Sequence, residues 1–270
     1  MSGGAPVQTG QPLLMVRGLV KTFGGVTAID DVTLDIREHE VLGIIGDNGA
    51  GKSTFLALVT GYYHADGGTF FHRGRRVEVS SPAKSRHSLS IEMVYQDLAM
   101  APDLTVWENL FLGEEVRRLG LFVDRVAMRR RATTLLEQMQ VPVKPNELVG
   151  SLSGGQRQLV AIARGLLFDR DIILLDEPTA SISAAKAADV LATIRSLEGR
   201  GKTVVLVSHR LEDVLAVSSR IAVFSRGRVS HLVDNTGLTV ADLFHLMYSD
   251  SGEEKVATGA ELAPMAAEGA

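Results

Sequence analysis

The fold of this chain is decided by Gly46-Asp47-Asn48-Gly49-Ala50-Gly51-Lys52-Ser53, which matches the pattern G-x-x-x-x-G-K-[S/T]. The stretch lies between a buried-strand pattern and a helix-forming run, as this motif requires. Glycines let the backbone curl so that its amides point at phosphate oxygens, and the following helix adds the positive end of its dipole. The motif therefore predicts a phosphate-binding loop, in which Lys52 reaches the β- and γ-phosphates and the Ser53 hydroxyl binds Mg²⁺.

Three short, unbroken apolar runs predict a parallel sheet: residues 41–45, 172–175 and 204–207. Such runs are typical of strands that helices cover on both faces. The front of the chain differs, because residues 13–20 are mostly apolar and residues 32–36 alternate apolar and polar side chains. That pattern predicts half-buried strands of an antiparallel sheet, so the expected class is α/β with an N-terminal antiparallel β subdomain.

Between Asp97 and Ser151 the pattern becomes helical. The charge-rich segment 126–140 carries Leu135 and Leu136 among its polar residues, as expected for an amphipathic helix. We interpret residues 97–160, approximately, as an α-helical subdomain inserted into the sheet domain.

An acidic pair, Asp176-Glu177, directly follows one predicted strand. Asp176 would hold Mg²⁺ directly or through water, and Glu177 would polarise the attacking water as general base. Alone, two acids after a strand can simply cap the strand, but the nearby phosphate-binding loop favours the catalytic interpretation.

A second glycine motif, Leu152-Ser153-Gly154-Gly155-Gln156, precedes the amphipathic segment 157–167. Free amides at a helix start, with a serine hydroxyl beside them, make another anion site. Because one γ-phosphate does not need two glycine loops from one chain, we expect Ser153, Gly154, Gly155 and Gln156 to contact the ATP of a partner subunit. The alternative is a plain turn before a helix.

The composition sets further limits. At 270 residues and 45% hydrophobic side chains the chain is long and apolar enough for a packed core. It has no cysteine, no histidine cluster typical of a transition-metal site, and no apolar segment near the roughly 18 residues that span a bilayer. A net charge of −4 argues against nucleic acid as a partner.

Five motifs in order resemble the ATP-binding cassette (ABC) family. They are the phosphate-binding loop, a strand ending in Val94-Tyr95-Gln96, the LSGGQ segment at 152–156, LLDEP at 174–178 and Val207-Ser208-His209. The resemblance covers residues 12–230, approximately, and implies a P-loop NTPase core whose nucleotide is sandwiched between two subunits.

The resemblance also assigns roles to residues outside the loop. It implies that Gln96 senses metal and attacking water, that His209 contacts the γ-phosphate and that Phe23 stacks on adenine. On the residues alone, the default interpretation of His209 is a structural histidine at a strand end, and that of Phe23 is a core aromatic. The implied ATP site comprises Phe23, residues 46–53, Thr54, Gln96, Asp176 and His209. The implied ligands of Mg²⁺ are Ser53, Gln96 and Asp176. The residues implied to act in catalysis are Glu177, His209, Gln96 and Lys52.

One position departs from the family pattern. After LLDEP, members commonly carry an aspartate that helps communicate across the dimer, whereas this chain has Ser183 there. A hydroxyl can hydrogen-bond but carries no charge, so the resemblance leaves strong coupling between the two sites in doubt.

Within the family, the stretches at residues 23–26, 47–48 and 94–113 are similar to cassettes of bacterial importers of ribose, xylose and fructose type. That similarity implies an ATP-hydrolysing subunit on the cytoplasmic face of the cell membrane, bound peripherally. Its implied partners are a second cassette, identical or different, integral-membrane permease subunits and an extracytoplasmic solute-binding protein. Residues 104–112, with Trp107 and Phe111, are either a docking surface for the permease or core of the helical insertion.

The expected boundaries are a cassette at residues 12–250, with disordered ends at 1–11 and 251–270. Two other functions stay open: a cassette for another solute, such as an amino acid or lipid, and an ABC ATPase that does not transport. The second is disfavoured because the chain shows neither a second cassette with a charged linker nor a long coiled-coil interruption. Cargo identity is not encoded in this subunit.

Overall fold

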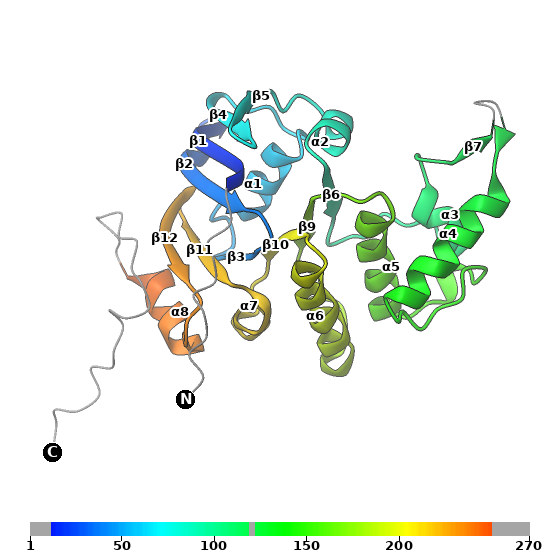
Figure 1. Ribbon diagram of the computed structural model, residues 1–270. Helices are drawn as coiled ribbons and strands as arrows, with labels where there is room; N and C mark the ends of the chain where they lie inside the picture. The colour runs from blue at the N-terminus through cyan, green and yellow to red at the C-terminus, as the bar shows by residue number, and fades with distance from the viewer. Residues whose placement is uncertain (1–11, 119–121, 250–270) are drawn as a thin grey trace, which may run out of the picture.

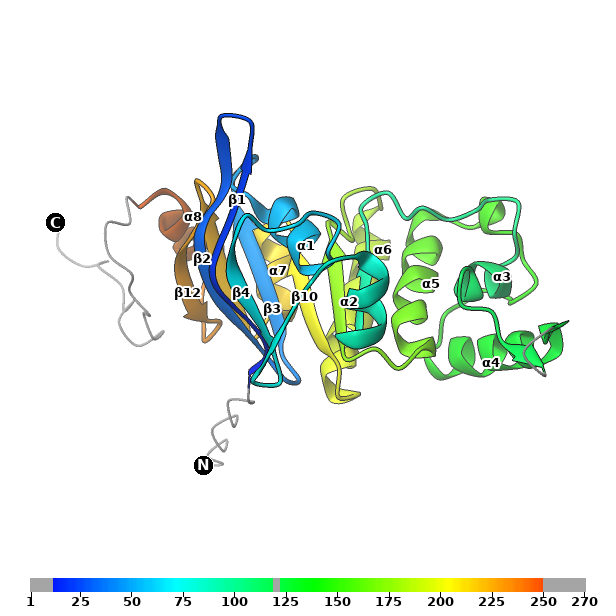
Figure 2. The same cartoon turned by 90° about the horizontal axis from the view of Figure 1, so that it is seen from above.

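The computed structural model describes residues 12–118 and 122–249. Both predicted disordered ends therefore lie outside the described residues. Figure 1 shows a central sheet with an antiparallel sheet on one side, helices on the other and a helical lobe at one end. Seen from above, the molecule is elongated, with that lobe and helix α8 (Val240–Tyr248) at opposite ends (Figure 2).

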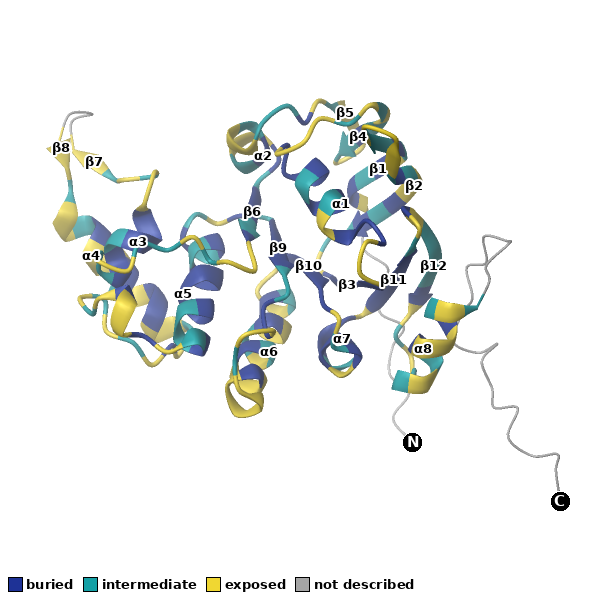
Figure 3. Ribbon diagram, turned by 180° about the vertical axis from the view of Figure 1, so that it is seen from behind, coloured by how far each residue is buried: buried dark blue, intermediate teal, exposed yellow. Residues whose placement is uncertain are grey.

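The central sheet confirms the predicted parallel core. Its strand order is β12-β11-β3-β10-β9-β6, and every pairing is parallel except the β11–β12 hairpin at the edge. All residues of β3 and β10 are buried, as their unbroken apolar sequences predict (Figure 3). The strands are β3 (Val41–Gly46), β6 (Ile91–Val94), β9 (Ile172–Asp176), β10 (Thr203–Val207), β11 (Arg220–Ser225) and β12 (Arg228–Asp234).

The front of the chain forms the predicted antiparallel sheet, in the order β2-β1-β4-β5. Buried side chains alternate along its longest pair, where Val16 faces Leu34 and Leu19 faces Val32. Their inner face packs with helix α1 and one face of the central sheet in a single apolar cluster. The elements are β1 (Pro12–Phe23), β2 (Val26–Arg37), β4 (Gly67–His72), β5 (Arg75–Val77), α1 (Lys52–Val59) and α2 (Pro82–Ser88).

Helices cover the opposite face of the central sheet and continue into the helical lobe, all sharing a second apolar cluster. The lobe contains a two-stranded hairpin, β7–β8, that the sequence pattern did not indicate, and helix α5 extends beyond residue 160. The elements are α3 (Val106–Phe111), β7 (Arg117–Arg118), β8 (Phe122–Val123), α4 (Arg125–Gln138), the 3-10 turn Val149–Ser151, α5 (Gly154–Leu167), α6 (Ala184–Gly199), α7 (Leu211–Val217) and α8 (Val240–Tyr248).

Of the two interpretations of residues 104–112, the structure supports core. Trp107 is 9% exposed and Phe111 is fully buried, because the short helix α3 turns its apolar face to α4 and α5. Leu112 is half exposed at the end of the helix. The large apolar side chains of α3 are therefore not available as a docking surface.

A buried carboxylate joins the central sheet to the helical lobe. Glu92 of β6 is 2% exposed and lies 3.3 Å from Arg164 of α5, 3.5 Å from Arg86 of α2 and 3.6 Å from Arg170. Arg170 also pairs with Glu114 at 2.6 Å. One side chain thus ties together two helices and the segment that leads into β9.

We expect the substitution Glu92→Gln to lower the free energy of unfolding by about 2–3 kcal/mol. Removing one partner of a buried ion pair leaves uncompensated charge, which typically costs about 3–5 kcal/mol, and two of the three arginines are solvated enough to reduce this figure. Urea denaturation of both proteins measures the difference. Equal urea midpoints for the wild type and Glu92→Gln would mean that solvent compensates the charges of the three arginines when the Glu92 carboxylate is absent.

Within residues 12–118 and 122–249, no helix has the length and apolar character needed to cross a bilayer.

Candidate functional site

The phosphate-binding loop connects β3 to α1, as predicted, and two of its glycines are required sterically. Gly46 has φ 148°, and a Cβ there would lie 2.2 Å from the carbonyl oxygen of Phe224. Gly51 has φ 103°, and its Cβ would lie 2.6 Å from the carbonyl oxygen of Ala28. Any side chain at either position would displace the loop from strands β2 and β11.

Lys52, the first residue of α1, turns back onto its own loop. Its Nζ donates to the carbonyl oxygens of Gly46 at 2.7 Å and Asp47 at 2.9 Å. Burial lowers the pKa of Lys52, against the opposing charges of Glu177, Asp176 and Asp47. The ammonium is therefore buried, satisfied by backbone, and close to both acids of the predicted site.

Asp176 ends β9 and faces the start of α1. Burial and then the neighbouring Glu177 raise the pKa of Asp176, while a hydrogen bond from the Ser53 hydroxyl and the charge of Lys52 lower it. The hydrogen bond from Ser53 and the charge of Lys52 thus do not fully offset the cost of burying the Asp176 carboxylate beside Glu177. Two hard oxygen donors in this setting fit Mg²⁺, which is held in nucleotide sites by one or two protein oxygens together with phosphates.

The raised pKa has a consequence for stability. A carboxyl whose pKa is higher in the folded state than its ordinary value of 3.8 favours folding at low pH, and this contribution is lost as pH rises through the raised pKa. At neutral pH, above the ordinary value, the burial of Asp176 therefore destabilises the metal-free protein. We expect Asp176→Asn to raise the melting temperature at pH 7 to 8 in EDTA and to leave it nearly unchanged at pH 4. A lower melting temperature at pH 7 would contradict the unfavourable burial.

Glu177 and His209 form a contact across the ends of β9 and β10. Glu177 Oε2 lies 2.7 Å from His209 Nδ1, and the Glu177 amide donates to the carbonyl of Val207 at 2.9 Å. Glu177 has φ 51°, a left-handed conformation that costs a non-glycine residue about 1–3 kcal/mol. Strain of this kind is typical of functional sites, and the contact gives His209 a polar partner in this site.

A cavity of about 360 Å³ lies between the sheet and the helical lobe. Gln96, Glu177 and Gly154 all line it, so three of the predicted motifs meet there. Gln96 itself is exposed.

The glycine motif forms the start of α5. The Ser153 hydroxyl accepts from the Gln156 amide at 3.4 Å, and the Gln156 side chain accepts from the Ser153 amide at 2.9 Å, which is a capping box. A Cβ on Gly155 would lie 3.0 Å from the Cβ of Lys186, so this glycine also lets α6 approach. The Ser153 hydroxyl remains exposed and free to donate.

Phe23 lies at the tip of the β1–β2 hairpin and is 42% exposed, which is not the core position of the alternative interpretation. The Tyr63 ring packs edge-on against it at 4.9 Å, and Lys21 Nζ lies 5.3 Å from its centroid. A supported, solvent-facing ring is suited to stacking on a base.

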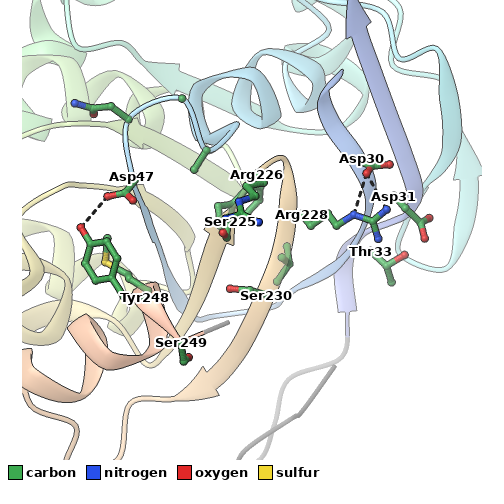
Figure 4. A pocket seen from close by; sticks show the side chains of 16 residues that line it. Asp30, Asp31, Thr33, Asp47, Ser225, Arg226, Arg228, Ser230, Tyr248 and Ser249 are labelled. Atoms are coloured by element: carbon green, nitrogen blue, oxygen red, sulfur yellow. Dashed lines mark hydrogen bonds and ion pairs between the residues drawn. The ribbon is translucent and has the colours of Figure 1, made fainter. Parts of the chain in front are cut away.

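On its other side the phosphate-binding loop borders a cavity of about 880 Å³ between the β11–β12 turn and α8 (Figure 4). There the Tyr248 hydroxyl donates to Asp47 Oδ1 at 3.0 Å, while Arg228 pairs with Asp30 at another edge of the same cavity. The sequence interpretation missed Tyr248, since 201 residues separate it from its partner and no local pattern marks the pair.

Ser183, at the position of the usual family aspartate, precedes helix α6 as its N-cap. Its hydroxyl makes no capping bond with the helix. The side chain is therefore free to take another partner.

Comparison with known proteins agrees with this geometry. Residues 29–180 match the family model described as ABC transporter. The chain belongs to the ABC transporter family. As an ABC cassette, it is an ATPase by membership of the family, and its fold is that of solved cassettes.

Curated relatives of this cassette are named for sugar import. It is 41% identical over 218 residues to the xylose/arabinose import ATP-binding protein XylG of Sulfolobus acidocaldarius, covering 80% of this chain and 86% of that one. It is 37% identical to the fructose import ATP-binding protein FrcA of Rhizobium meliloti, with 88% and 94% covered. The ribose import ATP-binding protein RbsA 1 of Rubrobacter xylanophilus is 41% identical, but this chain spans only 44% of its length.

Solved cassettes superpose over most of the chain. A nucleotide-free ATP-binding cassette from an ABC transporter gives a TM-score of 0.76 at 27% identity, covering 87% of this chain and 95% of that one. A dimeric cassette in a post-hydrolysis state, bound to ADP and Pi, gives 0.70 at 26% identity, covering 83% and 100%.

Proposed function

We propose that this cassette is the ATP-hydrolysing subunit of an ABC importer for a monosaccharide. The observation that carries the ATPase part is the Glu177–His209 contact beside the buried Lys52 and Asp176. The cargo class rests on the relatives, which are named for xylose/arabinose, fructose and ribose import.

In the proposed reaction, the loop amides and Lys52 bind the β- and γ-phosphates, and Phe23 stacks on adenine. Glu177 takes a proton from the attacking water, an effect typically worth about 10² to 10⁴ in rate. His209, held by Glu177 through Nδ1, presents its other ring nitrogen to the γ-phosphate.

Mg²⁺ would be held by Asp176, the Ser53 hydroxyl and Gln96, and when bound it neutralises the charge that develops on the phosphates. Among the described residues no group of three or more His, Cys, Asp or Glu side chains could hold a metal by itself. The remaining ligands in this proposal are therefore phosphate oxygens and water.

We further propose that Ser153, Gly154, Gly155 and Gln156 contact the nucleotide of a second cassette. The start of α5 belongs to the helical lobe, whereas α1 lies beneath the antiparallel sheet (Figure 1). A dimeric solved relative supports this arrangement. Permease subunits and a solute-binding protein complete the proposed assembly, with the cassette on the cytoplasmic face of the membrane.

Copurification from the native cell tests the proposal. The full chain, tagged and carrying Glu177→Gln, is solubilised in mild detergent with ATP, and bound proteins are identified by mass spectrometry. A polytopic permease with a sugar-binding protein supports monosaccharide import. Recovery of a binding protein specific for amino acids or lipids would mean that the cargo is such a solute and not a monosaccharide. Recovery of ribosomal or DNA-maintenance proteins without a permease would overturn the transport role.

A further inference from the structure

A buried hydrogen bond links the segments that follow the two candidate catalytic residues. The Thr179 hydroxyl donates to Asp213 Oδ2 at 2.5 Å, and the two residues are 1% and 5% exposed. Thr179 lies two residues after Glu177, and Asp213 lies four residues after His209. Neither residue contacts the cavities that border the phosphate-binding loop and Glu177.

The Thr179–Asp213 bond lies beyond the point where the hydrogen bonds between β9 and β10 end. The β9–β10 ladder ends at the pair Asp176–Val207, and the last backbone bond between the segments runs from the Glu177 amide to Val207. Beyond it, one chain enters the turn before α6 and the other enters α7. Apart from the Glu177–His209 contact itself, the Thr179–Asp213 bond is the next side-chain connection between them.

Glu177 requires such a connection because its backbone is strained. A non-glycine residue keeps a left-handed backbone conformation only where the contacts around it hold that conformation in place. Glu177 is such a residue, because its φ is 51°. The turn after it is closed by one backbone bond, from the Ala180 amide to the Glu177 carbonyl at 3.2 Å. Asp213 anchors this turn from the opposite segment, and Arg210, one residue after His209, lies 3.5 Å from the same carboxylate oxygen.

We propose that Thr179 and Asp213 are a positioning pair that sets the distance between Glu177 and His209. The proposal rests on the catalytic roles proposed above for those two residues. The pair acts through them, because both members are buried away from the nucleotide site.

A purely structural role for Asp213 is the competing explanation. An acid in the first turn of a helix is favoured by the helix dipole, and α7 has two such acids, Glu212 and Asp213. Glu212 is exposed whereas Asp213 is buried. Glu212→Ala is therefore the matched control, since it removes the same charge from the same turn without touching the link.

The test compares Thr179→Val, Thr179→Ser, Asp213→Ala and Glu212→Ala in the purified full chain. We expect Thr179→Val and Asp213→Ala to lower kcat about tenfold or more, since small misplacements of catalytic groups can cost up to about a hundredfold. The KM for ATP should stay within about twofold, and Thr179→Ser and Glu212→Ala should resemble the wild type. If Asp213→Ala does not fold, Thr179→Val, which keeps the side-chain shape, carries the test.

Combination with Glu177→Gln separates positioning from stability. If the pair acts through Glu177, adding Thr179→Val to Glu177→Gln should lower the residual turnover no further. A multiplicative loss in the double variant, or a fall in kcat that Glu212→Ala reproduces, would overturn the positioning role. An unaffected Glu177→Gln single variant would instead overturn the proposed role of Glu177 itself, whatever Thr179→Val does.

Discussion

Replacing Glu177 with glutamine is expected to lower ATP turnover about a hundredfold or more and to leave ATP binding intact. The amide keeps the size of the side chain and can still contact His209 Nδ1, 2.7 Å from Oε2 in the wild type, but it cannot take the proton of the attacking water. Only the chemical step should therefore be affected.

Single-turnover hydrolysis and nucleotide binding, measured on the same preparation, check this expectation. Glu212→Gln provides the control, because it makes the same chemical change on an exposed side chain of α7. Unchanged turnover in Glu177→Gln would remove this residue from the mechanism, and lost binding would mean that the substitution disturbed the loop instead of the reaction.

The substitution Ser153→Arg is expected to abolish hydrolysis while isolated monomers still bind ATP. Ser153 is exposed at the start of α5, so the added bulk projects outward, where the proposed partner nucleotide would lie. Equilibrium binding to dilute monomers and steady-state hydrolysis at high protein concentration measure the two properties separately.

Ser153 is also the N-cap of α5, and losing a cap typically costs about 1 kcal/mol. Ser153→Ala removes the cap without the bulk and is the matched control. Loss of monomer binding in Ser153→Arg would contradict contact with a partner's nucleotide. Equal loss of hydrolysis in both variants would assign the effect to the hydroxyl and its cap instead of to steric exclusion.

Much of this architecture could be predicted because its signals are local. The unbroken apolar runs identified β3, β9 and β10, and the loop motif identified the strand-to-helix turn at residues 46–53. Glu177 and His209 could be named from motifs, although their 2.7 Å contact joins residues 32 positions apart and only the folded sheet creates it.

Features that depend on tertiary packing could not be predicted. An apolar stretch such as residues 104–112 has the same composition whether it is core or a docking surface, and only the neighbouring helices decide that Phe111 is buried. The two-residue strands of β7–β8 are too short to show a period. The Thr179–Asp213 bond leaves no pattern in the sequence at all.

From the orientation of Lys52 we expect the loop to select nucleotides that carry at least two phosphates. A ligand that draws this ammonium away must replace two carbonyl acceptors, at 2.7 and 2.9 Å, with oxygens of its own. ADP and ATP carry phosphates that extend to the lysine and can make this exchange. AMP has no β-phosphate, so on binding AMP the Lys52 ammonium would either stay on its two carbonyl acceptors or lose them without gaining phosphate oxygens. We therefore expect the cassette to bind AMP more weakly than ADP or ATP, although the base and sugar of the three nucleotides are identical.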